Sequence, residues 1–398
     1  MRILLCGINE RVVGGVETYL RGLMAQLSGR GHQCLYGYEV PGGSGSAVAA
    51  SERSHHLSGH PARDAAAFKP DVIFQNSLLD PRSELSVAEV APVAFYVHAY
   101  GGMCISGTRR FAVPGKTVCG RVFGPGCWGP YFVRRCGGLN PATALGLYQQ
   151  NQLRSRSLRA ADVLLCASDY MRQRLLDHGI SAERVRTVPY FVQEPGSLSS
   201  VEDRFGARRL LFLGRVTDLK GWPELLEAVA LLQSRGKLWT LVVAGDGPDR
   251  LRLLQAARRR RLAVEHHPWL ESESRDRLIA SCTLLILPST WPEPFGLVGL
   301  EAARLAVPAV AFDVGGVREW LSPGLNGEIA APADPSALAD AAERAVSSEA
   351  HYVRLSSAAV QMAARFNVAR HLEALEEALA AAIANRARGA SGLFGSQC

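Results

Sequence analysis

Short apolar runs alternate with helical patterns through the first half of the chain. A buried strand is predicted at 2–8, and an amphipathic helix follows at 16–32, where apolar residues recur at helical spacing before a Gly-rich stop. Residues 40–65 are predicted to form a mobile surface loop because they are rich in Gly, Ser and Ala. Further strand-like runs lie at 71–77, 93–100, 162–168 and 184–190. Alternation of this kind predicts a parallel sheet with helices on both faces.

The same pattern starts again after a linker-like stretch at 193–207 that contains Gly, Ser and Pro. A strand near 208–214 is followed by a helix from Trp222 to about Ser234. The pattern then predicts a strand at 239–247, a helix to about Arg261, a short strand near Val264, a helix at 274–282, a strand at 284–289, the last parallel strand at 308–316 and a helix from Pro335. Two similar α/β halves joined by one linker are expected.

The expected fold is therefore α/β, with two Rossmann-like domains that face each other across a cleft. The predicted boundaries are 1–195 for the N-terminal domain and 207–370 for the C-terminal domain, with a cysteine-bearing insertion at 100–140 in the first of them. A helix at 371–388 is expected to cross back to the first domain, and 389–398 to be a flexible tail. Ligands in such sheets bind at the carboxyl ends of the strands, so we expect the site between the domains.

Composition agrees with two buried cores. The chain has 398 residues, of which 47% are hydrophobic and 20% charged. Its first residues carry a single Arg and a short apolar run, which is typical of a buried strand rather than a signal peptide. The sequence has no run of 18 uninterrupted apolar residues. A cytoplasmic protein without a membrane span is expected.

The distribution of charge is more informative than the net charge of +7. From Val90 to Ala161 there is no Asp or Glu, and this segment holds a set of cations. They are Arg109, Arg110, Lys116, Arg121, Arg134, Arg135, Arg154, Arg156 and Arg159. Such a surface attracts phosphates, anionic lipid or nucleic acid. No nucleic-acid motif is present, so nucleic acid is the least favoured partner, and a solvated basic face without a specific partner is the alternative.

Two loops of the second half carry candidate chemistry. The first ends a strand at Gly214 and places Arg215 and Lys220 on one strand-to-helix connection, which suits a diphosphate; two exposed side chains are the alternative. The second places Glu293 between two prolines and Glu301 eight positions later. If a helix begins near Gly296, its free N–H groups favour an anion, and Glu301 can accept hydrogen bonds from a ribose diol.

Together these segments resemble the donor domain of the retaining family 4 glycosyltransferases, which have the GT-B fold. The resemblance rests on the order of Gly214-Arg215, Lys220-Gly221, Gly245-Asp246-Gly247-Pro248, Glu293-Pro294-Phe295-Gly296 and Glu301. The stretch at 314–339 resembles the end of the same domain, and matching pieces run from residue 3 to about 370.

The resemblance implies roles for individual residues. Arg215 and Lys220, after Gly214, hold the pyrophosphate, and Glu301 holds the ribose. Glu293 and the backbone from Phe295 through Gly296 to Leu297 contact the donor sugar. The loop at 266–270, which includes Trp269, lies at the base; Pro268 stands where a glycine is typical, so the base is not fixed by the resemblance.

The N-terminal half offers three further candidates. Gly14 and Gly15 lie between a strand and a helix; a plain tight turn is the default, and the resemblance implies contact with the donor phosphates. His98 ends an apolar strand, where a satisfied core histidine is the usual case. The resemblance implies instead that His98 faces the donor sugar, although Ala99 replaces the aspartate that often follows. His98, Arg215, Lys220 and Glu293 are the predicted catalytic set.

Four of the nine cysteines lie close together in the sequence, at Cys104, Cys119, Cys127 and Cys136. Their spacing matches no standard zinc knuckle, and disulfides are not expected in a cytoplasmic protein. A structural zinc or iron–sulfur site is one hypothesis, and free thiols or pairing of some cysteines is the other. No cofactor is expected to be obligatory for catalysis.

The predicted activity is transfer of a sugar from a nucleotide diphosphate sugar to a hydroxyl of a sugar or lipid-linked acceptor, with retention at the anomeric carbon. It would serve cell-surface polysaccharide, glycolipid or glycosylated-metabolite synthesis, with peripheral contact to an anionic membrane, at the inner face of the plasma membrane, as a further possibility. The alternatives are a non-catalytic nucleotide-sugar-binding subunit and a glycoside hydrolase or phosphorylase. A diphosphate clamp is of no use to a hydrolase.

Overall fold

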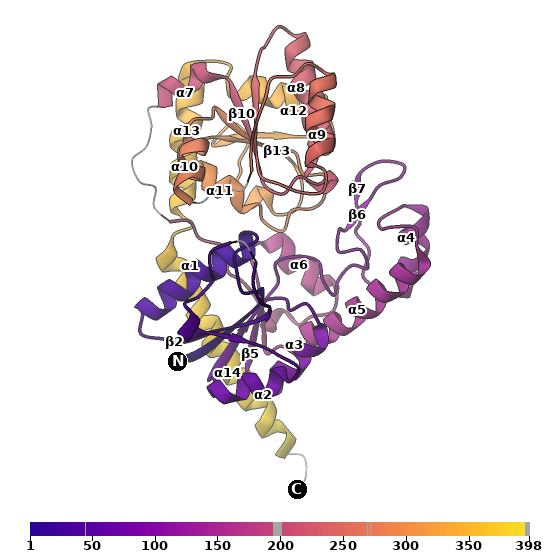
Figure 1. Cartoon of the computed structure of the whole chain (residues 1–398), viewed down its shortest axis with the longest axis vertical. Helices are drawn as coiled ribbons and strands as arrows, with labels where there is room; N and C mark the ends of the chain where they lie inside the picture. The colour runs from indigo at the N-terminus through magenta and orange to yellow at the C-terminus, as the bar shows by residue number, and fades with distance from the viewer. Residues whose placement is uncertain (44, 194–200, 269, 271, 395–398) are drawn as a thin grey trace. The chain divides into compact units, whose positions relative to one another are not determined.

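The computed structural model describes residues 1–398 except 44, 194–200, 269, 271 and 395–398, and it describes 202, 272 and 389–394 by their backbone alone. The chain divides into two compact units (Figure 1). Unit 1 comprises Met1–Gly107, Gly120–Tyr190 and Ala369–Cys398, and unit 2 comprises Thr108–Cys119 and Phe191–Val368. Among the described residues, no helix is long and apolar enough to cross a membrane.

Unit 1 is built on a seven-stranded sheet in which each strand pairs in parallel with its neighbours. Buried apolar residues fill the four central strands because helices cover both of their faces. In sheet order, the strands are β3 (Ser54–His56), β2 (Gln33–Val40), β1 (Arg2–Asn9), β4 (Val72–Gln75), β5 (Val93–Tyr96), β8 (Val163–Cys166) and β9 (Val185–Thr187).

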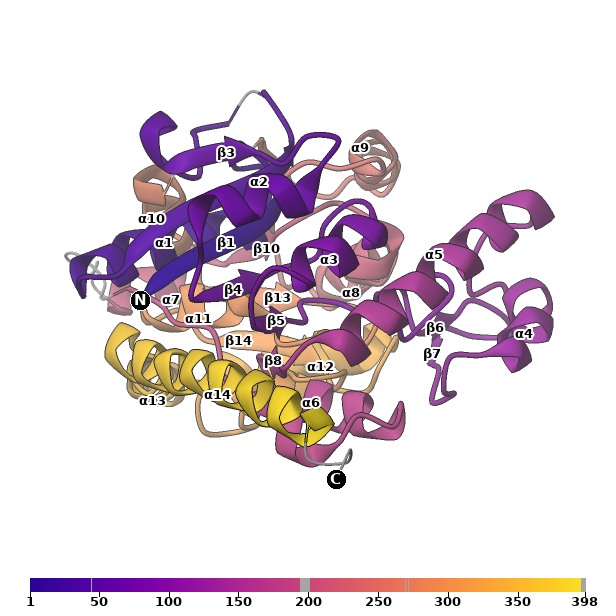
Figure 2. The ribbon, with the colours of Figure 1, turned by 90° about the horizontal axis from the view of Figure 1, so that it is seen from below.

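The helices of unit 1 lie on both faces of this sheet (Figure 2). One face carries α1 (Gly15–Gly29) and α14 (Val368–Phe394), which meet where the Tyr19 hydroxyl and His371 Nε2 lie 3.0 Å apart. The opposite face carries α2 (Pro61–Phe68), α3 (Pro81–Ala88) and α5 (Pro141–Ala160). The remaining helices are α4 (Trp128–Val133) and α6 (Asp169–Asp177).

The C-terminal helix returns to unit 1, as predicted from the sequence. Arg386 of α14 binds the carboxylate of Asp162, with Nε 2.9 Å from Oδ1 and Nη2 2.9 Å from Oδ2. Glu376 accepts from Arg30 at 2.8 Å. The helix continues to Phe394, beyond the end predicted at 388, so most of the predicted tail is helical. The added residues read Gly-Ala-Ser-Gly-Leu-Phe, and their two glycines disfavour a helix, so the sequence did not predict the extension.

Unit 2 is built on a second, six-stranded parallel sheet. In sheet order, its strands are β12 (Val264–His267), β11 (Thr240–Ala244), β10 (Arg209–Leu213), β13 (Leu284–Leu287), β14 (Ala309–Phe312) and β15 (Gly327–Ala330). One face carries α8 (Trp222–Ser234), α9 (Arg250–Arg259) and α12 (Pro335–Ala345) (Figure 1). The other carries α7 (Val201–Ala207), α10 (Ser272–Ala280), α11 (Leu297–Ala303) and α13 (Glu349–Ala364) (Figure 1).

The two predicted α/β domains are confirmed, and the structure corrects several details. Residues 108–119 of the predicted insertion belong to unit 2. The second half of the predicted linker is helix α7, because Arg204 donates to the Leu305 carbonyl oxygen at 2.7 Å and Phe205 packs on Tyr352. Strand β15 follows the strand predicted to be last, and β3 lies in the predicted mobile loop. Both strands are short and lack an apolar alternation that sequence could reveal.

Candidate functional site

The loop from Gly214 to Gly221 leads from β10 to α8 and includes a 3₁₀ turn at Asp218–Lys220. Its last residue packs backbone to backbone against the segment after β13. A Cβ at Gly221 would lie 1.7 Å from the Pro288 carbonyl oxygen, and its φ of 71° is in the left-handed region. Glycine is therefore required at this position, and it brings the Lys220 loop against the loop that carries Glu293.

Lys220 and Glu293 form an ion pair across these two loops. Lys220 Nζ lies 2.6 Å from Glu293 Oε1, the oxygen that also accepts a hydrogen bond from Trp291 Nε1 at 3.0 Å and one from the Ser289 hydroxyl. Glu293 is only 3% exposed, whereas the Lys220 side chain is 28% exposed. An ammonium has three N–H donors, so Lys220 can keep this bond and still donate to an anion. The sequence indicated both residues but not their contact.

Arg215 differs from Lys220 in its surroundings. Its side chain is exposed, and no carboxylate among the described residues pairs with it. A guanidinium in this position has all of its donors available to a ligand, and it can bind two phosphate oxygens at once. The loop therefore offers one unpaired cation and one cation already held in place by a buried carboxylate.

The segment after Glu293 is anchored in the core of unit 2. Phe295 is buried and packs edge-to-face on Phe366, with ring centroids 5.6 Å apart. Its carbonyl oxygen accepts from Trp320 Nε1 at 2.7 Å. Gly296 adopts a φ of 87°, and α11 begins at Leu297, one residue later than predicted. The ring of Phe295 is therefore held in the core of unit 2 and is not available to a ligand.

Glu301 lies on α11, where its Oε1 is 3.1 Å from Arg275 Nη2 on α10. Burial raises the pKa of Glu301 above its ordinary value, although the charges of Arg275 and Arg304 oppose that shift. Sequence reasoning missed Arg275, because the pairing depends on α10 and α11 packing side by side. A carboxylate held in this way keeps its second oxygen for a ligand hydroxyl.

In unit 1, His98 lies just beyond the end of β5 within a cluster of aromatic rings. Its ring stacks on Tyr96, with centroids 4.6 Å apart. Burial lowers the pKa of His98 to about 3. Its Nδ1 is 2.6 Å from the Tyr190 hydroxyl, and its Nε2 is 2.5 Å from Asn76 Oδ1. The orientation partner that Ala99 cannot supply is thus provided by residues distant in sequence.

The hydrogen bonds of Asn76 assign the tautomer of His98. Asn76 Nδ2 donates to the Cys6 carbonyl oxygen at 3.1 Å, so its Oδ1 accepts from the neutral imidazole. Nε2 of His98 then carries the proton, and the Tyr190 hydroxyl donates to Nδ1. With both nitrogens bonded and its pKa lowered, His98 is a fixed polar group rather than a base ready to accept a proton.

Gly14 and Gly15 lie at the carboxyl end of β1, where α1 begins. A Cβ at Gly15 would meet no atom within 4 Å, so the backbone is open there. Glu17, in the first turn of α1, accepts from Asn9 Nδ2 at 2.8 Å and is buried. Contact of these two glycines with the donor phosphates stays a prediction.

Two groups of predicted residues remain outside the site. Trp269 lies outside the described residues. In the described part of the chain, no group of three or more metal-ligating side chains lies close enough together to hold an ion, and this applies to Cys104, Cys119, Cys127 and Cys136. Cys127 and Cys136 instead pack with the apolar cluster around Tyr131 and Tyr148. The metal stays a prediction that the geometry does not support, and elemental analysis of the purified protein tests it.

Models of two glycosyltransferase families match the chain. Residues 13–194 match the model of Glycosyltransferase Family 4, and residues 202–362 match that of Glycosyl transferases group 1. The chain belongs to the family 4 glycosyltransferases. The second match includes Arg215, Lys220, Glu293 and Glu301, and the first includes His98. The predicted family is thereby confirmed.

Curated members of this glycosyltransferase group resemble the chain in part. It is 33% identical over 201 residues to the alpha-D-kanosaminyltransferase of Streptomyces kanamyceticus, covering 47% of this chain and 51% of that protein. It is 33% identical over 187 residues to the D-inositol 3-phosphate glycosyltransferase of Frankia alni, covering 43% and 46%. The match to glycogen synthase of Mycobacterium tuberculosis is 33% over 160 residues, covering 40% and 38%. The chain spans about half the length of these relatives or less.

Solved structures share the fold of this chain over nearly its whole length. Anabaena HepE, solved in complex with UDP, superposes with a TM-score of 0.67 at 19% identity, covering 96% of this chain and 100% of that one. Sucrose-phosphate synthase from Thermosynechococcus elongatus superposes with a TM-score of 0.71 at 17% identity, covering 100% of both chains. These likenesses show the predicted GT-B fold.

Proposed function

We propose that the protein transfers a sugar from a nucleotide diphosphate sugar to an acceptor hydroxyl. The observation that carries this proposal is the pair of loops in unit 2, where Arg215 and Lys220 offer cations beside the buried carboxylate of Glu293. Charge accumulates on the diphosphate as the glycosidic bond breaks, so fixed cations stabilise the transition state more than the bound donor. A glycoside hydrolase has no use for such a clamp.

The donor is proposed to bind along unit 2 with its ribose at Glu301 and its sugar near Glu293. A half-buried carboxylate that already accepts from Arg275 suits a ribose diol, because hydrogen bonds to charged acceptors are the stronger ones. HepE was solved with UDP and with UDP-glucose, which makes uridine donors the first to test. The acceptor is proposed to bind in unit 1, near His98.

Retention of anomeric configuration is part of the same proposal. The bond from the anomeric carbon to the phosphate oxygen breaks, and the acceptor oxygen forms its bond on the same face of the sugar. The acceptor proton passes to the departing phosphate oxygen. His98 is not needed as the base in this route, in keeping with its lowered pKa of about 3 and its two engaged nitrogens.

Peripheral contact with an anionic membrane is proposed as a secondary property. The insertion in unit 1 exposes Val122, Val133 and Leu139, and Val133 is 74% exposed. Arg135 lies close by in the sequence and is also exposed. Apolar side chains among cations suit the interface of a negatively charged bilayer.

The test is a donor panel. Purified protein is incubated with uridine, guanosine, adenosine and thymidine diphosphate sugars and with hydroxylated acceptors from a cell extract. We expect mass spectrometry to find one product heavier by a single sugar residue, and NMR to find the donor's anomeric configuration in it. Nucleotide binding without turnover would support a non-catalytic subunit instead, and release of free sugar without nucleotide would support a hydrolase.

A further inference from the structure

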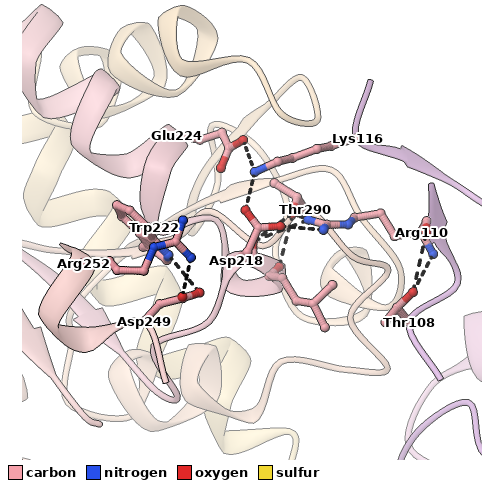
Figure 3. Close-up of polar contacts among 10 residues, drawn as sticks. Thr108, Arg110, Lys116, Asp218, Trp222, Glu224, Asp249, Arg252 and Thr290 are labelled. Atoms are coloured by element: carbon pink, nitrogen blue, oxygen red, sulfur yellow. Dashed lines mark hydrogen bonds and ion pairs between the residues drawn. The ribbon is translucent and has the colours of Figure 1, made fainter. Parts of the chain in front are cut away.

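A hairpin encoded in the first half of the chain belongs to the unit that carries the donor loops. The chain leaves unit 1 after Gly107, forms the antiparallel strands β6 (Arg110–Phe111) and β7 (Thr117–Val118), and re-enters unit 1 at Gly120. The proposed function gives no role to this hairpin. Two of its basic residues, Arg110 and Lys116, bind Asp218 in the loop after β10 (Figure 3).

Arg110 binds both loops of the candidate donor site. Its Nη2 lies 2.5 Å from Asp218 Oδ2 in the first loop, and its Nη1 donates to Thr290 Oγ1 at 2.5 Å in the second (Figure 3). Arg110 is only 8% exposed, so these bonds are made largely out of water. A planar guanidinium with fixed donor directions defines the distance between its two partners, which a lysine cannot do.

Lys116 completes the attachment of the hairpin. Its Nζ lies 2.8 Å from Asp218 Oδ1 and 2.7 Å from Glu224 Oε1 in the first turn of α8 (Figure 3). Both oxygens of Asp218 are thus held by hairpin cations. Burial alone would raise the pKa of Asp218, but the hydrogen bonds from Lys116 and Arg110 outweigh it and lower that pKa.

These contacts bear on the candidate donor site because of where Asp218 lies. Asp218 and Lys220 share one short 3₁₀ turn, and Thr290 lies three residues before Glu293. The two loops are linked by the ion pair of Lys220 and Glu293 and by the Thr290 N–H, which donates to the Leu219 carbonyl oxygen at 2.9 Å. Arg110 adds a side-chain link through Asp218 and Thr290. The ion pair uses groups that the donor is proposed to contact, whereas the Arg110 link does not.

We propose that Arg110 is a positioning residue for the donor, which fixes the Lys220 loop against the Glu293 loop through Asp218 and Thr290. This inference rests on the proposed function. Arg110 acts through the placement of Lys220 rather than by touching the ligand. The hairpin is then part of the donor-binding unit, and its sequence influences donor affinity from within the first half of the chain.

The test compares Arg110→Ala with a matched exposed arginine of unit 2, Arg258→Ala, and uses UDP as the probe. Calorimetry should find UDP affinity reduced about tenfold in Arg110→Ala, since a displaced Lys220 loses its charged hydrogen bond to the diphosphate, and unchanged in Arg258→Ala. Arg110→Lys should show a similar loss, because it keeps the charge without the fork. If Arg110→Ala does not fold, Arg110→Lys and Thr290→Val carry the test.

A double-mutant cycle with Lys220→Ala separates positioning from general stabilisation. If Arg110 acts through Lys220, removing Arg110 from the Lys220→Ala protein should cost much less than in the parent protein. Equal losses in both backgrounds, or unchanged UDP affinity in a folded Arg110→Ala protein, would overturn the inference and leave the proposed function standing. Unchanged affinity in Lys220→Ala itself would overturn both.

Discussion

The two units differ sharply in the chemistry at their candidate residues. In unit 2, the loops after β10 and β13 meet through charges, with Lys220 bonded to Glu293 and Arg110 bonded to Asp218. In unit 1, the group after β5 is an uncharged imidazole among tyrosine rings. The same strand-to-loop architecture therefore carries a charged site in one half and a neutral polar site in the other.

This difference matches the two kinds of ligand in the proposed reaction. A diphosphate brings negative charge that must be neutralised, and it gains most from fixed cations. A sugar or an acceptor hydroxyl is neutral and is positioned by hydrogen bonds and by packing on rings. Because the two halves of the fold are so alike, the side chains at the loops, rather than the sheets, decide what each half binds.

The largest expected effect concerns the charged site. Lys220→Ala removes a fixed cation and leaves the buried Glu293 carboxylate without its counter-ion. We expect kcat to fall by about 10²- to 10³-fold, as for loss of one preorganised transition-state donor. Steady-state kinetics with the active donor provide the measurement. Lys237→Ala, an exposed lysine of the same unit, is the control, and equal rates in both variants would contradict the charged site.

A smaller effect is expected at the ribose end of the donor. Glu301→Ala should weaken UDP binding by about tenfold to a hundredfold, because hydrogen bonds to a charged acceptor are lost. The raised pKa of Glu301 adds a pH dependence, with affinity falling as the pH drops and the carboxylate becomes protonated. Calorimetry across pH measures both. Glu227→Ala on the exposed face of α8 serves as the control, and an equal loss there would remove Glu301 from the site.

The buried neutral histidines of unit 1 should make the stability of the protein depend on pH in the acid range. The folded-state pKa of His98 is about 3 and that of His371 about 4, both below the ordinary value of 6.5. The unfolded chain therefore binds more protons, and the stability contributed by these burials is present above pH 6.5 and lost as the pH falls toward 3. His98→Gln should reduce this acid sensitivity by roughly 1 to 2 kcal/mol. Unfolding curves at several pH values test it, with exposed His60→Gln as the control.

The smallest expected effect concerns the membrane. A cation near an anionic bilayer contributes about 1 kcal/mol, so Arg135→Ala should reduce vesicle binding about fivefold. Sedimentation with anionic and neutral vesicles at low and high salt measures it, with exposed Arg258→Ala as the control. Absence of binding to anionic vesicles at low salt would end the membrane hypothesis.

Much of the fold followed from local pattern. The central strands of both sheets are apolar runs, and α8 begins and ends where Trp222 and Ser234 predicted. The edge strands β3 and β15 were not predicted, although β9 and β12 at the opposite edges were. Strand β3 reads Ser-His-His and β15 contains Gly and Glu, and neither has an apolar face to detect. Helix α7 was not predicted because its stability comes from contacts of Arg204 and Phe205 with residues far away in the sequence.

The candidate site was predictable in its residues but not in its contacts. Order and spacing indicated Lys220 and Glu293 separately, while their ion pair depends on how closely Gly221 lets two loops approach. The partners of His98 are 22 and 92 residues away along the chain, so no local pattern could indicate them. The hairpin illustrates the same limit, because Arg110 lies 108 positions before Asp218.

The charged loops of unit 2 are proposed to bind a diphosphate. Calorimetric titration of the parent protein and of Lys220→Ala with uridine, UMP and UDP tests this claim most directly. We predict that affinity in the parent rises from uridine to UDP, and that Lys220→Ala weakens UDP binding by about tenfold or more while leaving uridine binding unchanged. Equal binding of uridine and UDP by the parent protein, or equal UDP affinity in the two proteins, would contradict the claim.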